Sequence, residues 1–491
     1  MNRWQLCGRL FLFLFGSIIF ELHADQKPLV IVIPSYNNSK WYLQNLDSVF
    51  AQKYENYRVI YIDDFSNDST AQLVEQYVAQ RHQDQRFLLI RNNKRCGALA
   101  NHYKAVHMCE NNEIIVQLDG DDWFKHDNVL NIVNAAYQNN NVWLTYGQYE
   151  MYPPEHPGIS RKLSNTVIAN NGYRESKWIT SALRTFYAGL FKRIKLQDML
   201  YQGTFFKAAC DLAFMYPMLE MCGGNVQFID EIVYVYNCST NCNDFKMMLQ
   251  TQLHYDSVIR AQKKYTRLFT PPQESTARKN QLADIIIFAN QKKDLDKCLK
   301  SIKSFMTGYN NCFIFYSIDS DIEKAADNGD FDYSCVQLKP IYKNDDYKKI
   351  ILDTLLESKT AYTLIMSDKW QFITPISIET CVRLMEKTGA YCFSLSLGKN
   401  IKSHYLLARD QKIPLSQELD EGILAWQFIN GEYDWQGAHN FNATFYHKND
   451  LKKIFNQLNF SSYSTLHEAW SRYPFDLHSV GLYFEQVRAI N

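Results

Sequence analysis

One apolar segment of this 491-residue chain ends in a cluster of acids, and this change restricts where the segment can lie in a fold. Residues 113–124 have the sequence EIIVQLDGDDWF. The apolar residues within 114–118 predict a strand buried on both faces. Asp119, Asp121 and Asp122 cannot share that core, because burying an unpaired charge is costly. We therefore expect the acids at the C-terminal end of a central strand, facing solvent or a cation.

Asp119 and Asp121 flank Gly120, a spacing at which two carboxylates can converge on one hard divalent ion. Mg²⁺ or Mn²⁺ bound in this way keeps coordination sites for the phosphates of a substrate. An isolated Asp-x-Asp is, however, more typical of a solvated turn. A calcium loop is excluded, because Leu130 stands at the twelfth position, where such a loop requires Glu.

Composition excludes one class of function and favours several compact domains. The chain has 52 basic and 52 acidic residues, so it lacks the positive charge expected of a nucleic-acid-binding protein. It is 46% apolar, and its length predicts about two to four domains. No Gly/Ser-rich or Pro-rich stretch indicates a disordered linker.

Strand and helix patterns alternate along the first part of the chain. Residues 27–38 predict a strand that runs into a turn, 41–52 have apolar residues at helical spacing, and 57–70 predict a second strand that ends in acids. This alternation predicts right-handed crossovers and a mainly parallel sheet. Ligands of such sheets bind beyond the C-terminal ends of the strands. The acidic turns at 63–64 and 119–122 both fall on that edge.

Four segments, in this order and spacing, resemble the family 2 glycosyltransferases with the A-type nucleotide-sugar fold: VIVIPSYNN, VIYIDDFSNDST, RNNKRCGALANHYKAV and IIVQLDGDDWF. The resemblance covers residues 28–150 closely and 151–250 more loosely. It implies a metal-dependent, inverting transferase that moves a hexosyl or N-acetylhexosaminyl group from a nucleoside diphosphate sugar, with a UDP-sugar expected, to a hydroxyl of a glycan, lipid or protein acceptor. No QxxRW motif occurs, which argues against a processive synthase.

The same resemblance implies roles for individual residues. Asp63 or Asp64 would accept a hydrogen bond from the base, and Asp119 and Asp121 would hold Mn²⁺ or Mg²⁺. The remaining residues expected around the nucleotide sugar are Pro34, Ser35, Tyr36, Gly97, Asn101, Gly120 and Asp122. Without the other motifs, Asp63 and Asp64 would be interpreted as turn or cap residues, and Gly97 equally well as an ordinary turn glycine.

A general base for the acceptor hydroxyl is expected in FFKAACDLAFMYPMLEMCGG, which contains Asp211 and Glu220. Burial in this apolar segment would raise a carboxyl pKa and make it a better base. Asp211 is the first choice, because Asp-Leu stands where many relatives have Glu-Asp-Leu, although Cys210 replaces that Glu. A buried structural Asp is the alternative. Three basic residues upstream either contact phosphate or lie on a solvated helix face: Arg184, Lys192 and Arg193.

The second half of the chain resembles the first. Residues 282–305 resemble the first strand and helix, FIFYSIDSDIEKA resembles the second strand, and 362–372 resemble the acidic strand. Here Asp368 is flanked by Ser367 and Lys369, and a lysine opposes cation binding. The pattern predicts two tandem α/β domains of Rossmann-like, mainly parallel type, the second a degenerate, non-catalytic copy.

We place the catalytic domain at 27–245, a helical linker at 246–281 and the degenerate domain at 282–491. Residues 1–26 contain basic residues followed by the apolar run 10–20, which is shorter than the about 20 residues of a membrane span. This favours a signal peptide over an N-terminal anchor, and hence a secretory or membrane-associated location, with a cytosolic location as the alternative. If both halves lacked catalysis, the chain would be a carbohydrate-binding or scaffold protein.

Overall fold

The computed structural model describes residues 25–153, 156–240, 249–273, 282–318, 320–327, 335–404, 409–420 and 422–491. The predicted signal or anchor segment lies outside these residues, apart from its last two positions. Among the helices that the structure describes, none combines the length and the apolar character needed to cross a bilayer.

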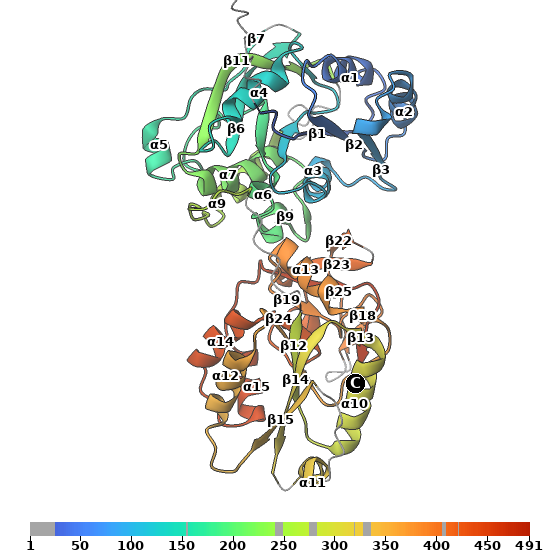
Figure 1. The fold of residues 1–491 in the computed structure, drawn as a ribbon, viewed down its shortest axis with the longest axis vertical. Helices are drawn as coiled ribbons and strands as arrows, with labels where there is room; N and C mark the ends of the chain where they lie inside the picture. Colours follow the sequence, from blue (N-terminus) through green and yellow to red (C-terminus); the bar gives the residue numbers. More distant parts are fainter. Residues whose placement is uncertain are drawn as a thin grey trace, which may run out of the picture.

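The chain folds into two α/β halves that follow one another along the longest axis of the molecule (Figure 1). The elements of the first half are β1 (Leu29–Ser35), α1 (Tyr42–Phe50), β2 (Tyr57–Asp63), α2 (Thr70–Gln80), β3 (Phe87–Arg91), α3 (Ala98–His107), β4 (Ile114–Gln117), β5 (Trp123–Phe124), α4 (Val129–Tyr137), β6 (Leu144–Tyr152), β7 (His156–Pro157), α5 (Asn165–Ala169), β8 (Arg184–Tyr187), α6 (Ala188–Phe191), β9 (Leu200–Tyr201), β10 (Thr204–Phe205), α7 (Cys210–Cys222), β11 (Val226–Asn237) and α9 (Leu249–Ala261).

The elements of the second half are β12 (Ala283–Phe288), α10 (Lys292–Phe305), β13 (Met306–Thr307), β14 (Tyr309–Ser317), α11 (Asp321–Asp327), β15 (Val336–Ile341), α12 (Tyr347–Glu357), β16 (Tyr362–Ser367), β17 (Gln371–Phe372), β18 (Ile376–Ser377), α13 (Ile378–Thr388), β19 (Cys392–Ser394), β20 (Ser403–His404), β21 (Arg409–Asp410), β22 (Ser416–Asp420), β23 (Ile423–Gln427), β24 (Thr444–His447), α14 (Lys448–Gln457), α15 (Tyr463–Ser471), β25 (Val480–Phe484) and β26 (Ala489–Ile490).

The sheet of the first half brings its polar strand ends together. Its strands run in the order β3-β2-β1-β4-β8-β6-β11-β5, and β3, β2, β1 and β4 are parallel to one another. Ser35 at the end of β1 pairs with Asp63, which in turn pairs with Arg91. The predicted α/β fold with a mainly parallel sheet is therefore confirmed for this half, and the turns after β1, β2 and β4 lie at one edge.

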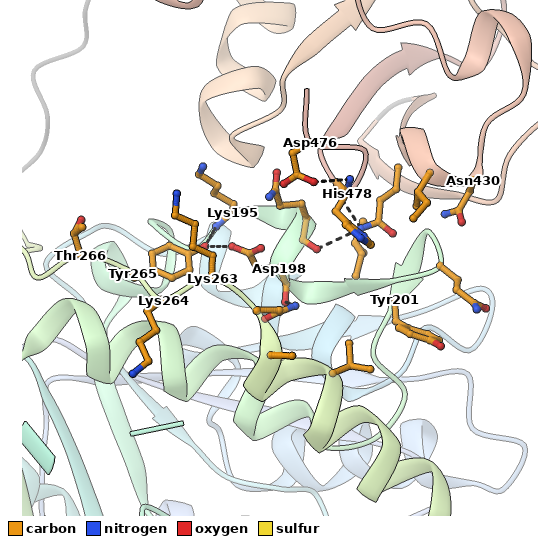
Figure 2. A pocket seen from close by; sticks show the side chains of 18 residues that line it. Lys195, Asp198, Tyr201, Lys263, Lys264, Tyr265, Thr266, Asn430, Asp476 and His478 are labelled. Atoms are coloured by element: carbon orange, nitrogen blue, oxygen red, sulfur yellow. Dashed lines mark hydrogen bonds between the residues drawn. The ribbon is translucent and has the colours of Figure 1, made fainter. Parts of the chain in front are cut away.

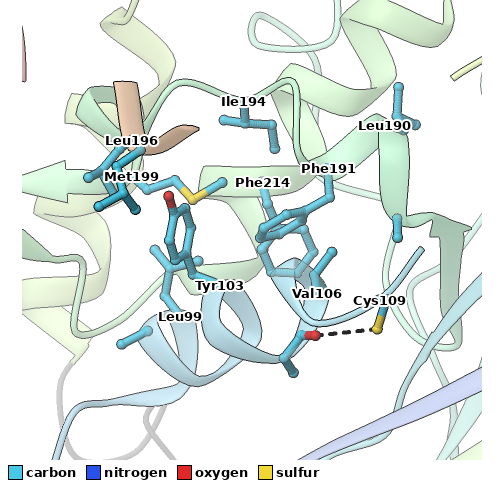
Figure 3. Close-up of a cluster of buried hydrophobic side chains, with 14 of the residues drawn as sticks. Leu99, Tyr103, Val106, Cys109, Leu190, Phe191, Ile194, Leu196, Met199 and Phe214 are labelled. Atoms are coloured by element: carbon cyan, nitrogen blue, oxygen red, sulfur yellow. Dashed lines mark hydrogen bonds between the residues drawn. The ribbon is translucent and has the colours of Figure 1, made fainter. Parts of the chain in front are cut away.

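Helix α3 is fixed against the rest of the first half by an apolar face. Leu99, Tyr103 and Val106 of this helix pack among side chains of α6, α7 and the segment between them (Figure 3). All three are at most 5% exposed. Full burial of such a side chain contributes about 1.5–3 kcal/mol. This packing fixes the start of α3 at the edge where the acidic turns lie.

Seven strands of the second sheet have the same order and directions as seven strands of the first. The second sheet runs β15-β14-β12-β16-β24-β19-β25 and continues with β23 and β22. As in the first half, the strands β15, β14, β12 and β16 are parallel, the fifth strand is antiparallel to both its neighbours, and the sixth and seventh are parallel. The corresponding pairs in the first half are β4 with β8, β8 with β6, and β6 with β11. Seven strands of the first sheet therefore have counterparts in the second, namely β3, β2, β1, β4, β8, β6 and β11.

The two halves contact each other through the loop before α3 and the β9–β10 hairpin. Lys94 Nζ lies 3.1 Å from Glu418 Oε2, and the backbone N–H of Gly203 donates to Gln427 Oε1 at 2.9 Å. A cavity of about 1000 Å³ lies between the halves. Side chains from both halves surround it (Figure 2), among them Lys195, Asp198, Tyr265, Asn430, Asp476 and His478.

Candidate functional site

A cavity of about 320 Å³ lies where β1, β2 and β4 end. It gathers most of the residues predicted around a nucleotide sugar, namely Pro34, Ser35, Tyr36, Asp64, Gly97, Asn101, Asp119, Asp121, Asp122 and Asp211. Three predicted residues do not line it: Asp63, Gly120 and Glu220. Each of the three has a structural reason for its position.

The acidic turn after β4 is held by amide side chains and by a close approach to β1. Asn45 Nδ2 donates to the carbonyl oxygens of Asp119 at 3.0 Å and Asp122 at 2.7 Å. A Cβ at Gly120 would lie 2.7 Å from the Cβ of Ser35, which is closer than real side chains approach. The glycine therefore belongs to the site by letting the turn pack on the first strand, and its own atoms do not face the cavity.

Asp122 anchors the turn from within. One of its carboxylate oxygens accepts from Tyr234 Oη at 2.5 Å and the other from the backbone N–H of Asn237 at 2.7 Å. Burial raises its pKa well above the usual value, and the neighbouring charges of Asp121 and Asp119 raise it further. Asp122 is thus engaged in supporting the turn, while Asp119 and Asp121 are half-buried at the cavity wall.

The pair Asp119 and Asp121 offers the hard oxygen ligands that Mn²⁺ and Mg²⁺ prefer. Burial raises the pKa of Asp119, Arg184 lowers it, and Asp211 raises it again. In the described part of the chain, no group of three or more His, Cys, Asp or Glu side chains is placed to bind a metal. Two carboxylates fit a cation that takes its remaining ligands from water and from a substrate, as Mg²⁺ commonly does with phosphates.

Asp64 organises the loop that leads to α3. Its carboxylate accepts from the backbone N–H groups of Cys96 and Gly97, both at 2.8 Å, and from Asn92 Nδ2 at 2.9 Å. Gly97 has φ +91°, a conformation that favours glycine, and it precedes the first residue of α3. The carboxylate therefore fixes the loop and still faces the cavity.

Asp63 stands behind this wall rather than in it. It is 4% exposed, and one carboxylate oxygen accepts from the backbone N–H of Ser66 at 3.2 Å. Its other oxygen has no hydrogen-bond partner among the described residues. Of the two acids predicted for base binding, only Asp64 is placed at the cavity.

Aromatic, cationic and amide groups complete this side of the cavity. The guanidinium of Arg95 lies 3.5 Å from the ring centre of Tyr36, a stacked cation–π contact. Asn101 is 1% exposed and accepts from Asn92 at 2.8 Å, while its own amide nitrogen has no partner among the described residues. A buried donor without a partner is costly, so this nitrogen is suited to hydrogen-bond a ligand.

Asp211 and Arg184, which also line the cavity, form an ion pair. Arg184 Nη2 lies 2.7 Å from Asp211 Oδ2, and Nη1 lies 3.4 Å from Gln117 Oε1. Arg184 is 8% exposed on strand β8, so the interpretation as a solvated helix face is wrong for this residue. Asp211 lies in the first turn of α7 and lines the cavity.

Glu220, the second predicted base, is instead part of a buried structural ion pair. Its carboxylate accepts hydrogen bonds from Arg174 Nε at 2.6 Å, from Arg174 Nη2 at 3.0 Å and from the backbone N–H of Tyr265 at 2.9 Å. The two charged side chains are 0% and 1% exposed. The prediction that Glu220 is a base is therefore corrected: its position ties α7 to the segment around Arg174.

Sequence reasoning missed several cavity residues; four of them, Asn38, Arg95, His102 and Gln117, lie inside the quoted motifs but were not singled out within them. The missed residues are Asn38, Arg95, His102, Gln117, Lys207, Tyr236 and Gln252. Gln117 had a visible signal, since it is the polar residue of an otherwise apolar strand. His102 had none. Burial, aided by Arg184, lowers its pKa to about 3, so this imidazole is neutral at physiological pH.

Comparison with known proteins agrees with this geometry for part of the chain. Residues 30–199 match the model of the family described as "Glycosyl transferase family 2". This part therefore carries the features of a family 2 glycosyltransferase domain, which confirms the resemblance of the four motifs. The chain is similar to "Putative glycosyltransferase EpsE" of Bacillus subtilis (34% identity, 19% of this chain and 32% of that protein) and to "Glycosyltransferase GlyG" of Streptococcus pneumoniae (24% identity, 25% and 39%). It thus spans well under half the length of these relatives.

Solved structures give weaker similarities. S. aureus TarS 1-349 in complex with UDP-GlcNAc is 17% identical, with 44% of this chain and 59% of that chain covered and a TM-score of 0.34. The mannosyltransferase PcManGT from Pyrobaculum calidifontis, in complex with GDP-Man and Mn²⁺, is 17% identical, with 50% and 67% covered and a TM-score of 0.35. TM-scores this low support no inference about the ligands of this chain.

The Arg174–Glu220 pair predicts a stability effect without a direct catalytic one. Glu220→Gln leaves the Arg174 charge buried without a counterion, and we expect a loss of about 3–5 kcal/mol in the free energy of unfolding. Urea denaturation measures this loss. Glu175→Gln is the matched control, because Glu175 pairs with Lys264 at the exposed surface and should change stability by less than about 1 kcal/mol. Full stability of Glu220→Gln together with loss of turnover would restore Glu220 as a base.

Proposed function

We propose that residues 27–245 are a metal-dependent, inverting glycosyltransferase domain that moves a hexosyl or N-acetylhexosaminyl group from a nucleoside diphosphate sugar to a hydroxyl acceptor. The donor is a UDP-sugar, the acceptor a glycan, lipid or protein, and the transfer non-processive. One observation carries the proposal: Asp64, Asp119, Asp121 and Asp211 all line one cavity beyond the ends of neighbouring strands. The match of residues 30–199 to a glycosyltransferase family supports it.

In this proposal the loop held by Asp64 forms the nucleotide side of the cavity. The stacked pair Tyr36 and Arg95 provides a flat, positively charged wall, and Asn101 offers an unpaired amide donor. A carboxylate that already holds two backbone N–H groups is rigid, and it can still accept from a ring N–H of uracil. Asp63 acts only by supporting the strand end.

Asp119 and Asp121 would hold the Mn²⁺ or Mg²⁺ ion. When bound, such an ion supplies positive charge that neutralises a diphosphate leaving group. The protein prepares this position with hydrogen bonds from Asn45, Tyr234 and Asn237, which fix the turn around the two carboxylates. A fixed turn needs little reorganisation when the donor binds, and such preorganisation favours catalysis.

Asp211 is the proposed general base. It removes the proton of the acceptor hydroxyl while the hydroxyl oxygen forms a bond to the anomeric carbon of the donor sugar. At the same time the bond between that carbon and the diphosphate breaks, and the diphosphate leaves. Arg184 holds one oxygen of Asp211 at 2.7 Å and so directs the carboxylate. A single carboxylate on the acceptor side suits one displacement, which inverts the configuration at the anomeric carbon.

The rest of the chain has a supporting part in this proposal. Residues 282–491 form a degenerate, non-catalytic copy of the domain, and 246–281, which include α9, connect the two. The matching strand orders of the two sheets support this assignment. We further propose that residues 1–26 direct the protein to the secretory route or attach it to a membrane.

The metal pair gives the first test. Asp121→Asn keeps the side-chain volume but removes a metal ligand, and we expect hydrolysis or transfer of UDP-sugars in the presence of Mn²⁺ to fall by about 100-fold or more. Turnover and thermal unfolding of the purified chain measure the effect. Asp84→Asn, at an exposed acid that does not line the cavity, is the control and should keep full turnover. Near-normal turnover by Asp121→Asn would refute the metal assignment.

The raised pKa values of Asp119 and Asp122 predict how metal binding depends on pH. A carboxyl whose pKa is raised by folding stabilises the protein below its unfolded pKa, and this contribution is lost as pH rises through the folded pKa. A metal binds the deprotonated form and offsets that loss. We therefore expect Mn²⁺ to raise the melting temperature more at about pH 8 than at about pH 5.5. An equal rise at both pH values, or the same rise in Asp121→Asn, would contradict this.

The base assignment predicts a different pattern. Asp211→Asn should lower kcat by about 100- to 10,000-fold, because it removes proton transfer from the acceptor. Binding of UDP with Mn²⁺, measured by calorimetry, should change little, since the metal pair and the loop of Asp64 are untouched. A variant with unchanged kcat, or one that loses UDP binding and kcat together, would argue against Asp211 as the base.

A further inference from the structure

The second half has a cavity of its own, of about 790 Å³, at the C-terminal edge of its sheet. It is called the second cavity because it belongs to the second half. It is formed where β12, β14 and β15 end, which is the edge that carries the candidate active site in the first half. Its wall includes Asn290, Ser317, Tyr342, Asn344, Tyr347 and Ser462. The two cavities can therefore be compared position by position.

Strand register shows that the metal pair has no counterpart in the second half. The first residues of β4 and β16 both pair with the first residue of the neighbouring strand, β1 or β12. Counting from them, Asp119 corresponds to Ser367 and Asp121 to Lys369. The acid between these two, Asp368, accepts from the backbone N–H of Asn290 at 2.6 Å and of Gln291 at 3.0 Å.

The acid proposed for base binding is also replaced. By the same register Phe288 corresponds to Pro34; Pro34 pairs with Ile62 in the first half, and Phe288 pairs with Phe315 in the second. By this register the position of Asp64 is occupied by Ser317. Lys343 is the one charged side chain among the described residues that line the second cavity. Among these described lining residues no carboxylate is present to bind a cation, and one lysine offers little positive charge to balance a diphosphate.

The wall of this cavity combines exposed aromatic surface with neutral hydrogen-bonding groups. Tyr342 is 56% exposed, and serine hydroxyls and asparagine amides stand beside it. Tyr347 is 6% exposed, and its hydroxyl has no partner among the described residues.

From these contacts we propose that the second cavity binds a neutral saccharide. A sugar ring has an apolar face of C–H groups, which suits the ring of Tyr342, and a rim of hydroxyls, which suits Asn344 and the serines. An anionic ligand would lack countercharge beyond one lysine, and a purely apolar ligand would leave the amides unpaired. The volume falls within the range of about 300–1000 Å³ that is typical of small-molecule sites.

The saccharide site lies far from the candidate active site. Helix α11, which follows β14, lies at the end of the second half that points away from the first half (Figure 1). A glycan bound there is anchored by the second half rather than placed for reaction in the donor cavity. The binding needs neither metal nor nucleotide sugar, so it does not depend on the proposed transferase activity.

Ligand-observed saturation-transfer NMR on the full chain tests the site. The probes are glucose, galactose, mannose, N-acetylglucosamine, maltose, cellobiose and N,N′-diacetylchitobiose at millimolar concentration. We expect at least one to bind, and Tyr342→Ala and Asn344→Ala each to weaken its binding about tenfold. Both side chains are exposed, so the melting temperature should stay unchanged.

Two control variants show whether the saccharide binds at this cavity. Tyr433→Ala removes an exposed tyrosine of the same half that does not line the cavity, and it should leave binding unchanged. Asp121→Asn should also bind the saccharide normally, which separates this site from transferase activity. Absence of binding by every probe, binding that survives both Tyr342→Ala and Asn344→Ala, or UDP binding that Tyr342→Ala abolishes would each overturn the proposal.

Discussion

The candidate active site depends on placing several carboxylates at one edge of a parallel sheet without losing the fold. Burial and mutual repulsion oppose this, as the raised pKa values of Asp119 and Asp122 indicate. The protein offsets the cost with directed hydrogen bonds: Tyr234 and the Asn237 backbone hold Asp122, and Asn45 holds the carbonyls of the turn. Strand β11 brings Tyr234 and Asn237 to this point, and helix α1 brings Asn45.

The two halves show that this architecture and its chemistry are separable. Seven strands of the two sheets have the same order and directions, yet the second sheet has serine and lysine where the first has its pair of acids. Strand register depends on apolar side chains inside the sheet, whereas the residues just beyond the strands contribute little to the core. One fold can thus present a carboxylate site at one sheet and a neutral, aromatic cavity at the other, and function must be argued from each site.

The sequence predicted the sheet and the edge where the acids gather, because both follow from local apolar runs and the turns after them. It did not predict which acids face the cavity. The Asp-Leu resemblance ranked Asp211 above Glu220, but the apolar segment left both as candidate bases, and only tertiary packing pairs Glu220 with Arg174. Asp63 and Asp64 are likewise adjacent in sequence but separated by the alternation of side chains at the strand end. Arg184 was misjudged because its strand carries no motif.

Arg184 links the two functional sides of the cavity. Its guanidinium binds Asp211 at 2.7 Å and lowers the pKa of Asp119, while Asp211 raises that pKa. The arginine therefore reduces the repulsion between the proposed base and the metal pair before any donor is bound. In the proposed function, a diphosphate would add negative charge and a cation at Asp119 and Asp121 would add positive charge, so the charge balance around Arg184 would change with each ligand. The ion pair that directs Asp211 is thus coupled to the state of the donor side, which relates the base to the metal pair through one side chain.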